Sequence, residues 1–337
     1  MHDIMTSPVA RAPARGRLLT AAAIGLALGA LPFVLQAIGQ PSLVPLATRV
    51  LIYAIAAASL NLALGFGGMV SFGHAAFFGI GGYVVGILYQ GFVGDTLLFG
   101  LLPGTNQLLI TLPAAMLVAG ILALCIGALC LRTSGVQFIM ITLAFAQMLF
   151  FLFVSIKAYG GDDGLIIRRR NVLLDLDTRN DTVFYFICLA AASLVFGALS
   201  RIVGSRFGMV LIGIRQSERR MAAIGVAPYS YKLTAFVVSG MGAGLAGALM
   251  ANYLRFVSPD MLHWTKSGEL MIMVILGGVG TVLGPLFGAA ALVILETVLT
   301  AWTEHWQLIL GPVLLFVVLF TQGGLSALFN RVGRVGR

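Results

Sequence analysis

The most basic long segment of the chain lies between two apolar stretches, at residues 201–232, with five arginines and one lysine against a single acid, Glu218. Ser217 is the expected N-cap of a helix that begins at the next residue, because its hydroxyl can accept a hydrogen bond from the free N–H groups at a helix start. Glu218 then lies at the positive end of the helix dipole. Gly225 suits the position after the last turn, and Pro228 bars continuation. The pattern predicts a short helix over residues 218–224.

A helix of about two turns is unstable alone in water, so we expect it to pack against something. Its residues divide into an apolar set and a basic pair: Met221, Ala222 and Ile224, with Arg219 and Arg220. Spacing alone leaves two interpretations open. The helix is a docking site for a partner, or it is an interfacial helix whose arginines bind lipid phosphates.

Residue patterns that support catalysis or metal binding are absent from the sequence. A P-loop needs Gly-Lys-Ser/Thr, and none of the three lysines (Lys157, Lys232 and Lys266) follows a glycine. The sequence has no zinc-binding histidine motif. Asp162 and Asp163 lie in Gly-Gly-Asp-Asp-Gly, which favours a tight turn over a metal site, with contact to an extracellular partner as a secondary hypothesis. We expect no enzyme activity and no cofactor in this chain.

The composition is that of a polytopic, all-α membrane protein. Of 337 residues, 59% are hydrophobic and only 10% are charged, and the mean hydropathy is +1.01. Soluble domains carry about 25% charged residues. The long unbroken apolar stretches favour helices over a membrane β-barrel. The net charge of +9 is interpreted as a topology signal and as contact with membrane lipid, not as nucleic-acid binding.

The apolar stretches predict about ten membrane spans. They cover residues 18–38, 44–64, part of 65–88, 107–131, 136–156, 182–199, 233–252, a stretch ending near 276, a stretch starting near 283, and 306–321.

Basic residues are distributed unevenly between the two sides that this prediction implies. One side, formed by residues 1–17, 132–135, 201–232 and 322–337, holds 13 of the 21 Lys and Arg residues and two of the twelve acids. The positive-inside rule therefore predicts that both termini are cytoplasmic. The expected organisation is a cytoplasmic arm (1–17), a single transmembrane domain (18–325) with the cytoplasmic loop 201–232, and a cytoplasmic tail (326–337).

Two glycine-rich breaks interrupt the apolar stretches, at residues 67–79 and 277–288, and their sequences resemble each other. Broken spans in both halves favour an internal repeat and a central pathway. The alternative is that Gly and Phe are simply common in membrane helices. The predicted path residues are Asn61, Gly67, Gly68, Ser71, His74, Gly277 and Gly278. His74 has a second interpretation, as a histidine at a helix start bonded to a nearby carbonyl.

The predicted spans hold few ionisable groups, chiefly His74 and Glu296. Ion-coupled carriers bury such groups at mid-membrane, so we expect the energy for translocation to come from elsewhere.

Three segments resemble the LivM-type permease of branched-chain amino acid ABC importers. They are residues 61–79 (NLALGFGGMVSFGHAAFFG), residues 131–145 (LRTSGVQF…ITLAF) and residues 213–226 (GIRQSERRMAAIGV). Residues 231–236 and 276–285 fit the same family, and the resemblance covers about residues 45–325. Gln137 stands where a bulkier aromatic residue is expected.

The resemblance implies a type II-like ABC importer permease in a bacterial inner membrane. Expected partners are a LivH-like second permease, two cytoplasmic ABC ATPases that use ATP and magnesium, and a periplasmic substrate-binding protein. The expected ATPase-contact residues are Ser217, Glu218, Arg219, Arg220, Met221, Ala222, Ala223 and Gly225. The resemblance itself carries Glu218, Ala222, Ala223 and Gly225.

The expected substrates are branched-chain or related amino acids, with urea or short amides as the alternative. A stand-alone facilitative channel or secondary carrier is the alternative of another class.

Overall fold

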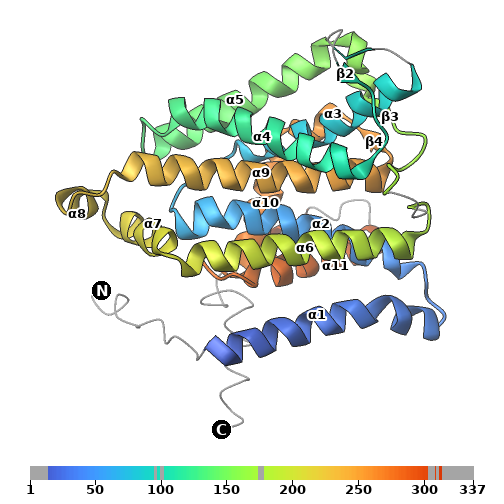
Figure 1. The fold of residues 1–337 in the computed structure, drawn as a ribbon, viewed down its shortest axis with the longest axis horizontal. Coiled ribbons are helices and arrows are strands. Elements are labelled where there is room, and N and C mark those ends of the chain that lie inside the picture. Colours follow the sequence, from blue (N-terminus) through green and yellow to red (C-terminus); the bar gives the residue numbers. More distant parts are fainter. Residues whose placement is uncertain are drawn as a thin grey trace.

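The computed structural model describes residues 14–94, 97–98, 102–173, 178–302, 308 and 311–312, and this part of the chain is a bundle of helices (Figure 1). The α-helices are α1 (Ala14–Ala37), α2 (Leu43–Asn61), α3 (His74–Val93), α4 (Leu108–Cys130), α5 (Val136–Ser155), α6 (Asp181–Gly204), α7 (Arg206–Gln216), α8 (Glu218–Ala223), α9 (Pro228–Leu254), α10 (Trp264–Gly277) and α11 (Gly284–Trp302). A π-helix, η1 (Leu62–Phe66), extends α2. The all-α prediction is confirmed.

Seven helices in the described residues are long and apolar enough to cross a membrane: α2 with η1, α3, α4, α5, α6, α9 and α11. They correspond to seven of the ten predicted spans. In α1, the part whose side chains the structure describes gives a shorter apolar helix, Ala23–Ala37, which is below the length of the other seven. The predicted span at 306–321, most of the N-terminal arm and the tail lie outside the described residues. The count of ten and the orientation therefore stay predictions.

The predicted eighth span, the stretch ending near 276, corresponds to α10, which does not reach the length of a full membrane span. α10 has 14 residues, which at about 1.5 Å per residue is near 21 Å, less than the roughly 30 Å of a hydrocarbon core. The residues before α10 form a buried 3₁₀ turn, η4 (Pro259–Leu262), that packs against α3. The split between the eighth and ninth stretches is confirmed, because α10 ends at Gly277 and α11 starts at Gly284.

α9 is the central helix of the bundle and packs against α4, α3 and α2. Its glycines allow very close backbone contacts, as is usual between membrane helices. A methyl group on Gly247 would lie 1.7 Å from the Phe78 carbonyl oxygen, and one on Gly81 would lie 1.9 Å from the Gly244 carbonyl oxygen. Only glycine fits at Gly81 and Gly247 without separating α3 from α9.

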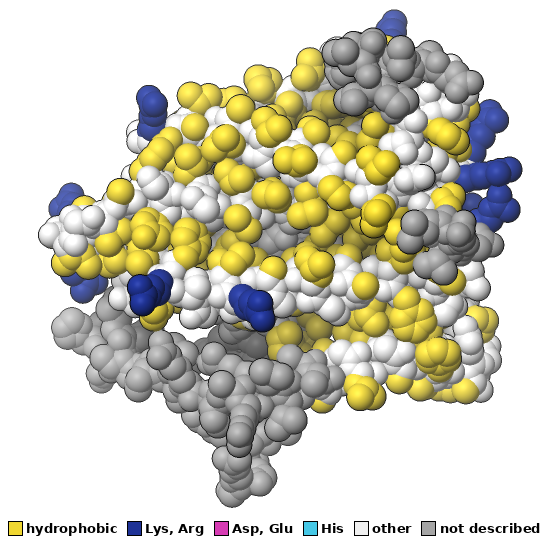
Figure 2. Space-filling model, viewed as in Figure 1, with side chains coloured by type: hydrophobic (Ala, Val, Ile, Leu, Met, Phe, Trp, Pro, Cys, Tyr) yellow, Lys and Arg dark blue, Asp and Glu magenta, His cyan; other side chains and the backbone are white. Residues whose placement is uncertain are grey.

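The lateral surface that Figure 2 shows is mainly hydrophobic, and the Lys and Arg side chains lie mostly near the two ends of the bundle. Within the bundle the charges are paired. Arg49 on α2 donates to Glu296 on α11 at 2.8 Å, and Lys266 donates to Glu269 at 2.9 Å. Pairing lowers the cost of ionised groups at membrane depth, so Glu296 serves here to join two helices.

The end opposite α8 is built from short irregular elements (Figure 1). Strand β1 (Leu97–Leu98) pairs with β2 (Leu102–Pro103), and β3 (Leu165–Ile166) pairs with β4 (Phe256–Val257), both antiparallel. Two 3₁₀ turns, η2 (Lys157–Tyr159) and η3 (Gly161–Asp163), precede β3.

The predicted Gly-Gly-Asp-Asp-Gly turn is confirmed, because Gly160 and Gly164 have φ angles of 85° and 76° on either side of η3. Among the described residues no group of three or more His, Cys, Asp or Glu could hold a metal ion.

Candidate functional site

The end of the bundle that carries α8 holds the candidate site, where α7 and α8 connect α6 to α9 (Figure 1). The Ser217 hydroxyl accepts a hydrogen bond from the Arg220 N–H at 3.3 Å, so the predicted N-cap is confirmed. α7 was missed in the sequence. Its start is marked by Ser205, whose side chain accepts from the Gly208 N–H.

α8 ends in a Schellman motif, in which two backbone N–H groups bond back to the last turn. The Gly225 N–H donates to the Ala222 carbonyl at 3.0 Å, and the Val226 N–H donates to the Met221 carbonyl at 3.1 Å. Gly225 has a φ of 86°, which explains why glycine suits this position. Pro228 is the first residue of α9, so it begins the next helix as well as ending this segment.

α8 has no buried residue. Met221 is half-buried and packs over Gly213 of α7, where its sulfur lies 2.9 Å from the place of an added methyl group. Glu218 forms an ion pair with Lys232 at the start of α9. Ile224, just after α8, is 73% exposed. The helix is thus held at its two ends and along one side, and its outer face is free for a partner.

Arg215, at the end of α7, reaches the first glycine-rich break. Its Nη1 donates a hydrogen bond to the carbonyl oxygen of Gly65 in η1. The stem of Arg215 lies over Gly68, where an added methyl group would be 2.9 Å from the arginine Cγ. Gly68 has a φ of 70°, so the chain turns at the start of the predicted break at residues 67–79. This contact joins the candidate site to the membrane helices.

The two glycine-rich breaks meet each other at Asn61. The Asn61 Nδ2 donates to the Thr281 carbonyl at 2.7 Å, and its Oδ1 accepts from the Gly280 N–H at 3.0 Å. A methyl group on Gly65 would lie 2.6 Å from the Gly280 nitrogen. Segments about 220 residues apart in the sequence are therefore packed backbone to backbone. The internal repeat itself stays a prediction.

Two further predicted path residues, Ser71 and His74, lie in the packed core in this conformation. The side chains of Ser71 and His74 are 0% exposed. His74 begins α3, and its Nε2 lies 2.7 Å from the Ser239 hydroxyl, which itself donates to the Ser59 carbonyl. His74 therefore contacts a hydroxyl and not the carbonyl expected in its second interpretation. A role for these residues in translocation stays a prediction.

Gly277 and Gly278 lie at the end of α10, as expected for a break. A methyl group on Gly277 would lie 2.0 Å from the Gly284 carbonyl oxygen, and Gly278 has a φ of 116°. Like Gly67, these glycines allow the backbone to turn, and they bring no reactive side chain to the site.

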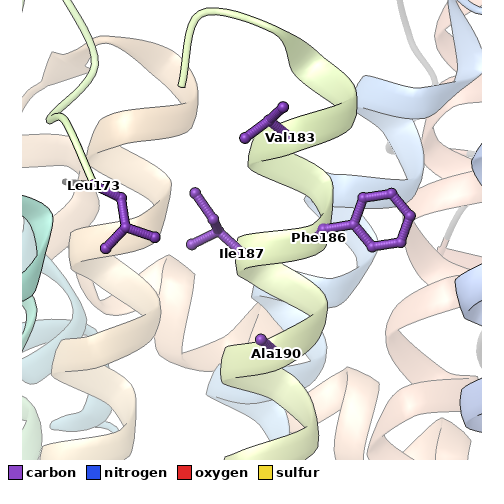
Figure 3. Close-up of a pocket in the computed structure, with 5 residues that line it drawn as sticks. All are labelled: Leu173, Val183, Phe186, Ile187 and Ala190. Atoms are coloured by element: carbon purple, nitrogen blue, oxygen red, sulfur yellow. The ribbon is translucent and has the colours of Figure 1, made fainter. Parts of the chain in front are cut away.

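An apolar hollow on α6 has the wrong chemistry for a charged substrate (Figure 3). It is lined by carbon atoms of Leu173, Val183, Phe186, Ile187 and Ala190. A zwitterionic amino acid needs polar partners for both of its charges, so we assign no substrate site here.

Comparison with known proteins decides the family. The family described as "Branched-chain amino acid transport system / permease component" matches residues 42–319. The chain belongs to this permease family. The match includes α2 to α11, and with them both glycine-rich breaks and the α7–α8 segment.

Curated relatives carry the same description. This permease is 26% identical over 306 residues to the high-affinity branched-chain amino acid transport system permease protein LivM of Salmonella typhimurium LT2 and to that of Escherichia coli K12, covering 84% of this chain and 69% of each relative. It is 26% identical over 302 residues to the probable LivM of Methanocaldococcus jannaschii, covering 80% of this chain and 86% of the relative. No solved structure matched the permease.

Proposed function

We propose that this permease is a subunit of an ATP-driven importer that moves branched-chain or related amino acids across a bacterial inner membrane. The observation that carries the proposal is α8: an exposed, capped helix on a membrane-spanning permease of a family named for branched-chain amino acid transport. The LivM relatives are named for the same transport. A six-residue helix exposed on its outer face gains stability when a partner covers that face.

The proposed partners are the ones that the family resemblance implies. The sequence of the chain contains no P-loop, so ATP and magnesium would bind to two separate cytoplasmic ATPases, one of which contacts residues 217–225. A second, LivH-like permease and a periplasmic binding protein complete the proposed assembly. This arrangement requires α8 to be cytoplasmic, and the positive-inside distribution of Lys and Arg supports that orientation.

The test is reconstitution in vesicles. The permease is purified with candidate ATPase, second-permease and binding-protein subunits from the same organism, and uptake of radiolabelled leucine is measured with the binding protein outside and ATP at the ATPase side. We expect uptake with ATP and none with a non-hydrolysable analogue. Uptake by the permease alone, without ATP, would instead show a facilitative channel or carrier. Uptake of urea or acetamide in place of leucine would show the other substrate class.

The contact is tested by replacing two residues of the proposed docking segment. The double variant Glu218→Ala with Gly225→Ala removes the Lys232 ion pair and strains the Schellman motif. We expect normal membrane insertion but loss of ATP-dependent uptake. Unchanged uptake would exclude α8 as the coupling contact.

A further inference from the structure

The two glycine-rich breaks are the places where the bundle can bend most easily. Helical bonding is irregular at η1, and the loop after α10 contains Gly278 and Gly280 with φ angles of 116° and 78°. Hinges in proteins form at such element ends, where a few residues absorb a change in φ and ψ. The intact helices on either side are stiff by comparison. A change in the shape of the bundle is therefore concentrated at these breaks.

Arg215 is placed to act on both breaks. It donates to the Gly65 carbonyl of η1. The neighbouring carbonyls of Leu62, Ala63 and Leu64 accept backbone N–H groups from Gly67, Met69 and Gly68, so the arginine supplies a donor to the Gly65 carbonyl at this helix end. A cation at a helix C-terminus also suits the helix dipole. The same Nη1 lies 3.4 Å from the place of an added methyl group on Gly280. The guanidinium thus sits where the two breaks meet, next to the Asn61 bonds.

The same arginine is fixed to the exposed segment. It lies on α7, two residues before Ser217, and Ser217 is the N-cap of α8. Met221 packs α8 back onto α7 at Gly213. A displacement of α8 therefore moves α7 with it, and the hydrogen bond from Arg215 carries the motion to Gly65.

We propose that Arg215 is a positioning residue that transmits movement of α7–α8 to the two glycine-rich breaks and so links ATP hydrolysis to opening of the permease. This inference rests on the proposed function, because it needs an ATPase to act on α8.

The test compares Arg215→Gln, Arg215→Lys and Arg206→Gln in the reconstituted complex. Arg206 is the matched control, since it is an exposed arginine of the same helix and its replacement changes the net charge equally. The readout is leucine taken up per ATP hydrolysed. We expect Arg215→Gln to lower this ratio about tenfold, because one hydrogen bond from a charged group is lost. The rate of ATP hydrolysis should stay within about twofold of the wild-type rate. Arg215→Lys keeps a charged donor and should recover part of the ratio.

A second measurement follows the breaks directly. Amide hydrogen exchange over residues 277–284 should change between nucleotide-free and nucleotide-bound wild-type complex, and should not change in the assembled Arg215→Gln complex. A wild-type ratio and wild-type exchange in Arg215→Gln would overturn the proposal. Absence of ATP-dependent uptake in the wild-type complex would instead contradict the proposed function, so the two failures are distinguishable.

Discussion

At the scale of single residues, Asn61 shows why a buried polar side chain is hard to interpret from sequence. It was predicted to line a path, and the structure shows it bonded through both ends of its amide to Gly280 and Thr281. These partners lie 219 and 220 residues away, so no local pattern indicates them. The second glycine-rich break was visible in the sequence, but its contact with the first was not.

Replacing Asn61 by leucine should destabilise the protein. The change leaves the Gly280 N–H and the Thr281 carbonyl, which are partly buried, without their partner. An unpaired polar group that is fully buried costs about 1–3 kcal/mol, and that range is the upper bound for each of these two. We expect a clearly lower midpoint of thermal unfolding in detergent. Gln90→Leu, at an exposed position of α3, is the control. It should change the free energy of unfolding by no more than about 0.5 kcal/mol, so its midpoint should stay close to that of wild type. Equal midpoints for the two variants would refute the structural role of Asn61.

Arg215, the residue proposed to position the two glycine-rich breaks, is one that the sequence analysis did not single out. It was counted among the arginines that set the orientation of the chain, because a basic loop residue and a residue that caps a distant helix look alike in one sequence. Its presence in residues 213–226, one of the segments that carries the family resemblance, was the signal that could have singled it out.

At the scale of elements, most helices and both breaks could be predicted because apolar stretches and glycines are local features. The sequence could not show whether a segment between two helices is buried in the bundle or exposed at its surface. The sequence analysis predicted no element between the span at 233–252 and the stretch ending near 276, yet Pro259–Leu262 is a turn with three buried residues that packs on α3 just before α10. Burial of such a turn depends on Gly79 and Gly82, which make room for Leu262 and Met261.

The packing of α3 on α9 predicts a strong effect of a single methyl group. In Gly247→Ala the new methyl would lie 1.7 Å from the Phe78 carbonyl oxygen, so the two backbones must separate, at a cost of about 1–3 kcal/mol. In Gly197→Ala on α6 the new methyl has no atom within 4 Å. The free energy of unfolding should therefore rise by up to about 1 kcal/mol, because alanine has a higher helix propensity than glycine. Thermal unfolding in detergent measures both. A stabilising Gly247→Ala would contradict the observed α3–α9 contact.

α8 gives a prediction about the C-terminal cap. Gly225→Ala forces alanine into a left-handed conformation, φ 86°, at a cost of about 1–2 kcal/mol, and should loosen α8 and lower leucine uptake per ATP. Gly39→Ala carries a similar strain, φ 79° with no atom within 4 Å, but lies between α1 and α2. It should leave the ratio unchanged. If both variants lower uptake per ATP equally, the effect comes from general stability and not from α8.

At the scale of the whole molecule, the described helices form one bundle with different structure at its two ends. One end carries α7 and the exposed helix α8, whereas the other end is closed by short strands and 3₁₀ turns (Figure 1). The composition predicted the membrane class, and the family match covers residues 42–319. The proposed energy source outside the chain fits a permease in which Arg49 and Glu296, on two of the described spans, are paired with each other.

The most direct test of the coupling claim is a cross-linking experiment on the assembled complex. In one variant a cysteine replaces Ala222 on α8. In the other a cysteine replaces Ile166, which is 74% exposed on β3 at the opposite end. Both variants lack Cys125, Cys130 and Cys188. A short thiol-to-amine cross-linker is added to each complex. The account predicts a covalent permease–ATPase product from the cysteine at position 222 and none from that at position 166. A product from position 166 alone would contradict it.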